Sequence, residues 1–476
     1  MNWRECAGRI NYEYIVKAAF IVAASFICFI LIRYGNYYPW SDEWHLIPLI
    51  TGTASLNLEE LFRPHGEHVI PLLKAAYFIV SKFSLGDFRI HILVNAIILS
   101  LACYTILRSI VSIRGTARLS DMFLIFSLLH LSHGVYFWGF HFQFISSTTI
   151  LLLIFAIFTQ QGFKNTPWTL YKAIAMGVLI LLLPLCGVNG LVPAFLISVY
   201  LVVISLRVIR QKNYAPGLIM LLLSGASLCI GALILFKFSL RGSPSPFTSH
   251  TPYEFFVTSA NVFTSPLGAK FGARIDAKIL LLFFIASGLM AIMPTRFLRI
   301  LGLRNFFVSD MGELRIHYLV FTISILLLVA SIGYGRGSRG WEQGLEMHYS
   351  LLAVPLFICQ YFAFELYRHR VVKIFLQGLM AVAFGIVFFT SLPVALDMGK
   401  CTEKRLLAVD RDLLGGMTLH QMSIVHTSDL FYVDQSDTRE AVEKGLSLLK
   451  EANIGRFGYS QSGIPAVNTG EKKEHP

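Results

Sequence analysis

Long apolar runs separated by short polar segments occupy most of this chain. A helix needs about 20 consecutive apolar residues to cross the hydrocarbon core of a bilayer. Runs of this kind predict about 11 transmembrane helices, near residues 15–34, 89–110, 119–138, 144–160, 172–187, 190–206, 216–238, 278–295, 316–333, 349–366 and 373–395. The pattern therefore predicts an all-α polytopic membrane protein.

The segment 69–83 is also apolar, but its pattern indicates a helix that lies in the membrane interface. Leu73 and Val80 recur on one helical face, while Lys74 and Lys82 share the opposite face. If this segment crossed the membrane, all the basic connections described next would be exported. We therefore expect interfacial helices in the first outer loop, residues 35–88.

Lys and Arg are concentrated in every second connection between the predicted spans. The cytoplasmic side of a membrane protein retains such residues. The N-terminus is therefore expected in the cytoplasm, and the first loop outside. Because the number of predicted spans is odd, the C-terminus is expected outside the cytoplasm. The expected location of the protein is a bacterial plasma (inner) membrane. The basic groups are Arg108/Arg114/Arg118, Lys164/Lys172, Arg207/Arg210/Lys212, Arg296/Arg299/Arg304/Arg315 and Arg368/Arg370/Lys373.

The composition agrees with a membrane protein. Hydrophobic residues make up 55% of the chain, its mean hydropathy is +0.63, and its formal net charge is +12. In a soluble chain that charge would suggest nucleic acid, but basic cytoplasmic loops explain it here. We therefore expect the lipid bilayer, and no nucleic acid, as a partner. Most cysteines lie in predicted spans, so no disulfide framework is expected.

Two domains are predicted, a transmembrane domain over residues 1–396 and an extracytoplasmic tail over 397–476. The tail is polar and contains few long apolar runs. An amphipathic helix is expected from Asp437 to about Asn453, and disorder is expected over 460–476. The tail lacks the clusters of polar residues that are typical of a catalytic site, so we do not expect it to be the catalytic domain. We expect it to pack over the outer loops.

The first outer loop concentrates ionisable residues beside the membrane, where such groups are costly and often functional. Asp42 and Glu43 are the candidate catalytic bases, because a positioned carboxylate can accept the proton of an attacking hydroxyl. On an extended segment adjacent side chains point apart, so one of the two would face the substrate. The alternative is that both are solvated acids that cap a helix starting at Glu43.

Three further residues of this loop, His65, Glu67 and His68, have side chains that bind metals or phosphate. Together with Asp42 they would form the ligand set of a divalent metal that steadies a phosphate group. Their spacing matches neither the common zinc signature nor its inverse. In the alternative interpretation, Glu67 and His68 begin the interfacial helix. The sequence requires no cofactor, and a divalent metal remains an open alternative.

The glycine-rich segment 333–349, on the outer side, carries Arg336 and Arg339. Arginine forks suit phosphate oxygens, and glycines let a backbone approach a ligand closely. We expect these arginines to contact a phosphate group. The alternative is a flexible turn in which they pair with Glu342 and Glu346.

Two other outer segments are weaker candidates. Lys270 and Arg274 offer a further phosphate or acceptor contact, although a solvated loop explains them equally simply. The aromatic turn 138–142 is more typical of a membrane belt than of a platform for a sugar.

The order of the first elements resembles a known enzyme group. The pair Asp42–Glu43 follows the first span, an interfacial helix begins at His68, and Gly86 and Arg89 lead into the second span. This module is similar to that of the GT-C superfamily of polytopic glycosyltransferases, which includes protein O-mannosyltransferases and aminoarabinose transferases. The resemblance covers roughly residues 15–110 and is architectural beyond them. It departs from many members in having His-Gly-Glu-His at 65–68 instead of a Pro-Pro-Leu stretch.

The resemblance implies a GT-C-like membrane domain whose first outer loop is catalytic. It also implies a polyprenyl-phosphate-linked sugar donor and a glycan or glycolipid acceptor at the outer face, as in the assembly of cell-envelope glycans such as lipopolysaccharide. The sequence contains no Gly-rich phosphate loop of the kind that binds a nucleotide sugar. A donor carried by a membrane lipid does not need such a loop.

Two other classes of function stay open at this point. A transporter or flippase of a lipid-linked sugar predicts ionisable groups near the bilayer midplane and an internal repeat. In this sequence the charges gather at the outer interface instead. A non-catalytic subunit of an envelope-glycan assembly system is the third class.

Overall fold

The computed structural model describes residues 12–65, 68–131, 138–164, 167–239, 251–293, 295–301, 307, 311–431 and 433–459. This part of the chain is helical apart from turns and two isolated β-bridges. Nine of its helices are long and apolar enough to cross a membrane. They are α2 (Tyr12–Tyr34), α6 (Arg89–Arg114), α8 (Phe142–Lys164), α10 (Val188–Arg210), α11 (Tyr214–Ser239), α14 (Ile275–Ile292), α16 (Gly312–Arg336), α17 (Met347–Ala363) and α18 (Arg370–Leu414). The predicted all-helical, multi-span architecture is confirmed.

The predicted number of 11 spans is not confirmed, because two of the predicted runs form shorter apolar helices. Residues 119–138 contain the 3₁₀-helix η2 (Leu119–Asp121) and α7 (Met122–Leu128), and 132–137 lie outside the described residues. The run 172–187 contains α9 (Leu170–Leu182) and the 3₁₀-helix η6 (Leu183–Cys186). Pro184 lies in η6, where its missing N–H cannot continue an α-helical ladder.

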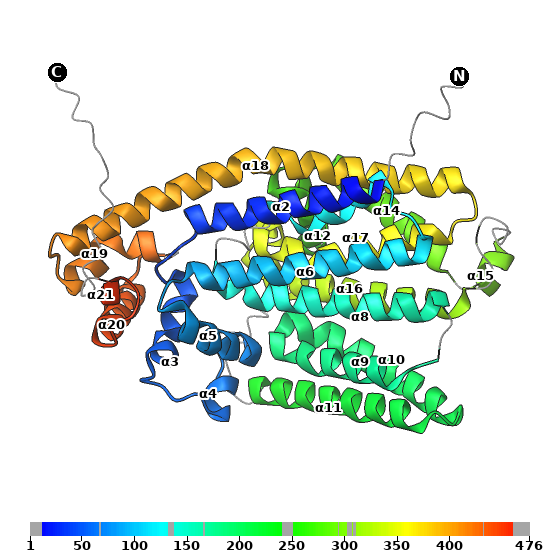
Figure 1. Cartoon of the computed structure of the whole chain (residues 1–476), viewed down its shortest axis with the longest axis horizontal. Helices are drawn as coiled ribbons and strands as arrows, with labels where there is room; N and C mark the ends of the chain where they lie inside the picture. Colours follow the sequence, from blue (N-terminus) through cyan, green and yellow to red (C-terminus); the bar gives the residue numbers. More distant parts are fainter. Residues whose placement is uncertain are drawn as a thin grey trace, which may run out of the picture.

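The long helices lie side by side, and further short helices lie at the two ends of the bundle (Figure 1). We call one end the loop end. It is formed by the first outer loop, with α3 (Ile47–Thr51), α4 (Leu58–Phe62) and α5 (Pro71–Ser84), and by the tail helices α19 (Leu419–Leu430), α20 (Ser436–Glu451) and α21 (Arg456–Tyr459). The turns that follow α6 and α10 lie at the other end, which we call the basic end.

Helix α17 forms the centre of the bundle. Every residue in its most apolar 18-residue window is buried, whereas α2 and α11 are only 28% buried in theirs. A helix that is apolar on all sides is typical of a position enclosed by other helices. Helix α17 follows α16 through the hairpin 337–346, so this central pair fixes the position of Arg336 at the loop end.

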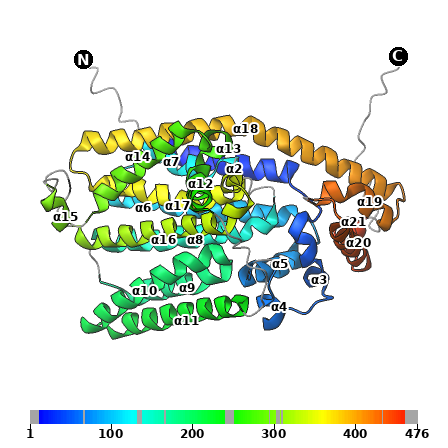
Figure 2. The ribbon, with the colours of Figure 1, turned by 180° about the vertical axis from the view of Figure 1, so that it is seen from behind.

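Helix α18 contains 45 residues, so it is about 67 Å long at 1.5 Å per residue. That is roughly twice the thickness of the hydrocarbon core. The sequence-based domain boundary at 396/397 therefore lies inside one continuous helix. Beyond the bundle, α18 leads to the tail helices, which turn back toward the first loop (Figures 1 and 2). Leu406 and Val409 of α18 are buried in one cluster with Trp44 of the first loop.

Helix α5 corrects one prediction about the interfacial segment. Lys74 was expected on the exposed polar face, but it is buried. Its Nζ donates to the carbonyl oxygens of Glu60, at 2.6 Å, and Arg63, at 2.9 Å. These carbonyls lie at the C-terminus of α4, where a cation satisfies otherwise unpaired groups. Lys82 is exposed as predicted, and the exposed face of α5 also carries apolar Ile79 and Phe83.

Candidate functional site

Asp42 and Glu43 lie on the 3₁₀-helix η1 (Ser41–Leu46), which follows the turn after α2. Ser41 begins this helix with a φ of 54°. The pair was expected on an extended segment, so the local structure differs from that expectation. Successive side chains on a 3₁₀-helix also point in different directions. The two carboxylates consequently occupy unlike environments.

Glu43 is buried and joins three segments of the loop end. Its Oε1 accepts hydrogen bonds from the Tyr77 hydroxyl of α5, at 2.5 Å, and from the Phe140 backbone N–H, at 3.1 Å. Its Oε2 accepts from the Trp40 backbone N–H at 2.8 Å. Burial raises the pKa of Glu43 to about 7, although the three donors act in the opposite direction. Glu43 therefore caps η1, as one alternative held, but from the interior and not as a solvated acid.

Asp42 is the accessible member of the pair. Its side chain is 39% exposed, and its Oδ1 lies 3.8 Å from Nε2 of His65. That distance is longer than a hydrogen bond. A ligand that enters this region can therefore reach the Asp42 carboxylate without displacing a buried partner.

His65 and His68 are held next to each other by their backbones. The His65 N–H donates to the His68 carbonyl at 2.7 Å, and the His68 N–H donates to the His65 carbonyl at 2.9 Å. The His65 ring lies 5.4 Å from the ring of His45 and 5.0 Å from that of Phe140. Glu67 lies outside the described residues, and within them no three His, Cys, Asp or Glu side chains are arranged to hold a metal ion.

A row of rings continues from this loop toward α17, and we call Trp40, Trp138, Phe140, His141 and His348 the aromatic row. Trp138 contacts three of its members, with ring-centroid distances of 5.1 Å to Trp40, 5.4 Å to Phe140 and 4.5 Å to His141. His141 lies 5.6 Å from His348. The aromatic turn 138–142 thus packs against the first loop, which the sequence did not indicate.

Two members of the aromatic row carry buried donors. Among the described residues, the indole N–H groups of Trp40 and Trp138 have no hydrogen-bond partner. A buried donor without a partner costs free energy, and native proteins leave few of them. Both groups are candidate donors for a ligand whose entry displaces part of this aromatic packing.

Arg336 lies at the far end of the aromatic row. It ends α16, and its Nε donates to the Tyr349 hydroxyl at 2.8 Å. Arg336 and His68 both lie close enough to His348 to act on it electrostatically. Burial raises the pKa of Glu346, and the positive charge of Arg336 opposes this rise only in part. Arg336 therefore brings a cation to the same end of the bundle as Asp42.

The remaining predicted site residues are less informative. Arg339 is exposed on the 3₁₀-helix η9 (Gly337–Arg339). Lys270 lies on α13 (Gly268–Gly272), and its side chain lies outside the described part of the structure. Arg274 is exposed and pairs with Asp276 at 2.7 Å. The structure thus brings Asp42, His65, His68 and Arg336 toward one region and leaves Arg274 in a separate surface pair.

The tail helices hold the first loop through contacts that the sequence did not reveal. The indole N–H of Trp44, the residue after Glu43, donates to the Leu430 carbonyl at 2.9 Å. Gly445 of α20 faces the same ring so closely that an added Cβ would lie 2.4 Å from it. The hydroxyl of Tyr38 donates to Asp410 of α18 at 2.9 Å. The tail therefore positions η1, which carries both carboxylates.

Comparison with known protein families, curated proteins and solved structures found no match. The functional argument consequently depends on the residues themselves. An accessible carboxylate, a row of aromatic rings with buried donors and an arginine lie along one end of a membrane bundle. That set can accept a proton, contact a polar ligand that has an apolar face, and stabilise an anion.

Proposed function

We propose that this protein is an integral-membrane glycosyltransferase. It moves a sugar from a polyprenyl-phosphate-linked donor to a glycan or glycolipid acceptor at the outer face of the plasma (inner) membrane. The main support is the arrangement at the loop end, where the aromatic row separates the accessible carboxylate of Asp42 from the cation of Arg336. The resemblance of residues 15–110 to the GT-C module gives further support.

In the proposed reaction Asp42 accepts the proton of an acceptor hydroxyl. The hydroxyl oxygen then forms a bond to the anomeric carbon of the donor sugar. The bond between that carbon and the phosphate oxygen breaks, and the phosphate keeps the electron pair. Arg336 and Arg339 stabilise the developing negative charge, because a guanidinium fork matches phosphate oxygens.

The other residues of the site bind and position. The faces of Trp40 and Trp138 suit the apolar face of a sugar ring, and their indole N–H groups suit its oxygens. His65 and His68 lie beside Asp42 and extend the polar surface toward the acceptor. Glu43 holds η1 in place through its three hydrogen bonds. This mechanism requires no cofactor, since side chains provide both the base and the cation.

The proposed orientation places the loop end outside the cytoplasm. Lys and Arg are retained on the cytoplasmic side of a membrane. The basic connections, such as the turn after α10 that contains Lys212, lie at the opposite end of the bundle. Single cysteines at Ser55 and Lys444, introduced into a cysteine-free background, should react with an impermeant thiol reagent on intact spheroplasts. A cysteine at Lys212 should react only after lysis. The reverse pattern would contradict the orientation.

Deletion of the gene tests the function itself. We expect the deletion strain to accumulate a polyprenyl-phosphate-linked sugar and to produce an envelope glycan that lacks one residue. The wild-type gene should restore both, and the Asp42→Asn variant should restore neither. Asp276→Asn, at an exposed carboxylate outside the site, is the matched control and should complement fully. An unchanged profile of lipid-linked sugars in the deletion strain would contradict the proposal.

A further inference from the structure

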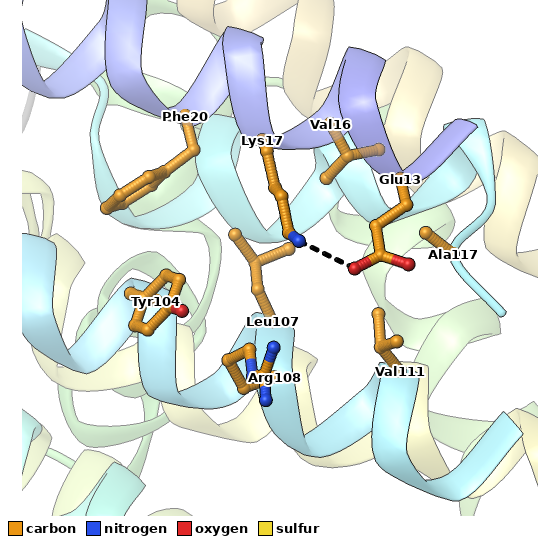
Figure 3. Close-up of a pocket in the computed structure, with 9 residues that line it drawn as sticks. All are labelled: Glu13, Val16, Lys17, Phe20, Tyr104, Leu107, Arg108, Val111 and Ala117. Carbon is orange, nitrogen blue, oxygen red and sulfur yellow. Dashed lines mark ion pairs between the residues drawn. The ribbon is translucent and has the colours of Figure 1, made fainter. Parts of the chain in front are cut away.

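A shallow pocket lies between α2 and α6 at the basic end, far from the first outer loop (Figures 1 and 3). Its apolar lining comes from both helices and includes Phe20 of α2 and Tyr104 of α6. The two rings contact each other, with centroids 5.8 Å apart. The charged lining consists of Glu13, Lys17 and Arg108. An apolar surface with a charged edge is therefore built from two separate helices.

The charged edge has a net positive charge. Lys17 Nζ pairs with Glu13 Oε1 at 2.7 Å, one helical turn away. Arg108 is exposed, and its positive charge also acts on Glu13. Figure 3 shows Lys17 and Arg108 extending toward the pocket from opposite helices. Two cations thus share one acid, so the site favours a further anion.

The depth of the two cations fits the headgroup region of a membrane. Lys17 lies five residues after the start of α2 at Tyr12, and Arg108 lies six residues before the end of α6 at Arg114. Both are therefore about 8–9 Å inside the helix ends. From this depth a long basic side chain extends to the lipid headgroups while its stem stays in apolar surroundings.

We propose that this pocket binds an anionic phospholipid of the leaflet at the basic end. The phosphate lies between Lys17 and Arg108, and the first carbons of an acyl chain lie against Phe20 and Tyr104. A soluble phosphate would leave this apolar lining uncovered, and a zwitterionic lipid would bring a third cation to a site that already has two. The low burial of α2 within the bundle gives lipid direct access. This inference is independent of the proposed enzymatic function.

Native mass spectrometry of the full-length protein, with phosphatidylglycerol or phosphatidylcholine added, tests the proposal. Phosphatidylglycerol should be retained in preference to phosphatidylcholine. Lys17→Ala and Arg108→Ala should each weaken its retention roughly fivefold, the effect of one cation near an anionic surface. Glu13→Gln should strengthen retention, because it removes the acid that competes with the phosphate. A merely misfolded variant would not bind more tightly.

The matched control is Arg210→Ala, which removes an exposed cation at the same end of the bundle from α10. It should leave the retention of phosphatidylglycerol unchanged. If Arg210→Ala weakened retention as much as Arg108→Ala, the effect would be general surface charge and the pocket would not be a site. Displacement by soluble glycerol phosphate at concentrations similar to those of the lipid would also overturn the proposal.

Discussion

The two ends of the helix bundle use charged residues in opposite ways. At the basic end, Arg114, Asp121 and Glu365 have side chains that are 3%, 0% and 5% exposed. Arg114 lies 2.6 Å from Asp121 and 2.8 Å from Glu365. At the loop end, Asp42 is 39% exposed, and its carboxylate Oδ1 lies 3.8 Å from Nε2 of His65.

Neighbouring groups complete the network at the basic end. The Tyr361 hydroxyl of α17 donates to Asp121 at 2.6 Å, and the Gln377 amide of α18 donates to Glu365 at 2.9 Å. Arg118 also pairs with Glu365 at 2.9 Å. The network therefore joins α6, η2, α17 and α18 by contacts that lie entirely within the protein.

This difference separates charges that hold the fold from an accessible charge that we propose faces a ligand. A buried charge is tolerated only when partners compensate for its lost hydration. Glu43 follows that rule at the loop end, and the network of Arg114 follows it at the basic end. Asp42 does not need such partners, because it stays hydrated. Substitution of Glu43 or of a residue in the Arg114 network should therefore change the unfolding free energy strongly, and substitution of Asp42 should change it weakly.

The largest loss of stability should follow from Asp121→Ala. The variant leaves the buried Arg114 without its closest partner, and breaking a buried pair costs about 3–5 kcal/mol. Thermal unfolding of the purified protein in detergent would measure the effect. Tyr361→Phe removes a single hydrogen bond of the same network and should cost about 1 kcal/mol. An unchanged unfolding midpoint in both variants would contradict the structural role of the network.

The second-largest effect is the pH dependence of folding stability that Glu43 causes. Its pKa in the folded protein is about 7, above the ordinary value of 4.5, so the folded state binds this proton more tightly. Stability should therefore be highest below about pH 4.5, fall as pH rises to about 7, and then stay level. The total is on the order of 3 kcal/mol. Glu43→Gln should remove this component from the pH profile of thermal unfolding, and an identical profile in the variant would argue against it.

Local patterns predicted most of the fold, because hydropathy and length are properties of short segments. Nine predicted runs correspond to long apolar helices. The continuous α18 was not predicted, since its chain becomes polar near Asp397 although the helix continues. Lys74 was assigned to the wrong face because its partners are carbonyl groups at the end of α4. Apolar Ile79 and Phe83 are exposed while Lys74 is buried, so periodicity alone does not say which residues of α5 contact the rest of the protein.

The candidate site was predictable only as a set of residue types in one loop. Which of Asp42 and Glu43 is buried depends on Tyr77 and on Phe140, which is 97 residues away from Glu43 in the sequence. The bond from Trp44 to Leu430 joins positions 386 residues apart. Such contacts come from the packing of distant elements, and no local pattern in a single sequence encodes them.

Gly445→Ala should have a smaller effect than either buried charge. The new Cβ would overlap the Trp44 ring, and overpacking of this kind costs about 1–3 kcal/mol. We expect the tail helices to separate from the first loop, which limited proteolysis would detect as faster cleavage after α18. Gly378→Ala, at a helical position with open space, is the control and should not increase cleavage. Equal cleavage of the two variants would show that the tail does not depend on this contact.

Arg336→Lys should change stability still less, because the side chain is only half-buried and keeps its charge. It loses the planar fork, so single-turnover transfer should slow more than donor binding weakens. Arg339→Lys should behave in the same way if both arginines contact the phosphate. A normal rate in Arg336→Lys and in Arg336→Ala would place the cation for the leaving group elsewhere.

The most direct test of the account is to measure stability and transfer together for Asp42→Asn. Asp42 is an exposed carboxylate whose ion-pair partner His65 lies 3.8 Å away, so its loss should leave the unfolding free energy within about 0.5 kcal/mol of the wild-type value. Transfer from a polyprenyl-phosphate-linked sugar should nevertheless fall at least about 100-fold, because an amide cannot accept the proton. Glu43→Gln should keep measurable transfer. Near-normal transfer by Asp42→Asn in a stable protein would contradict the claim that Asp42 is the base.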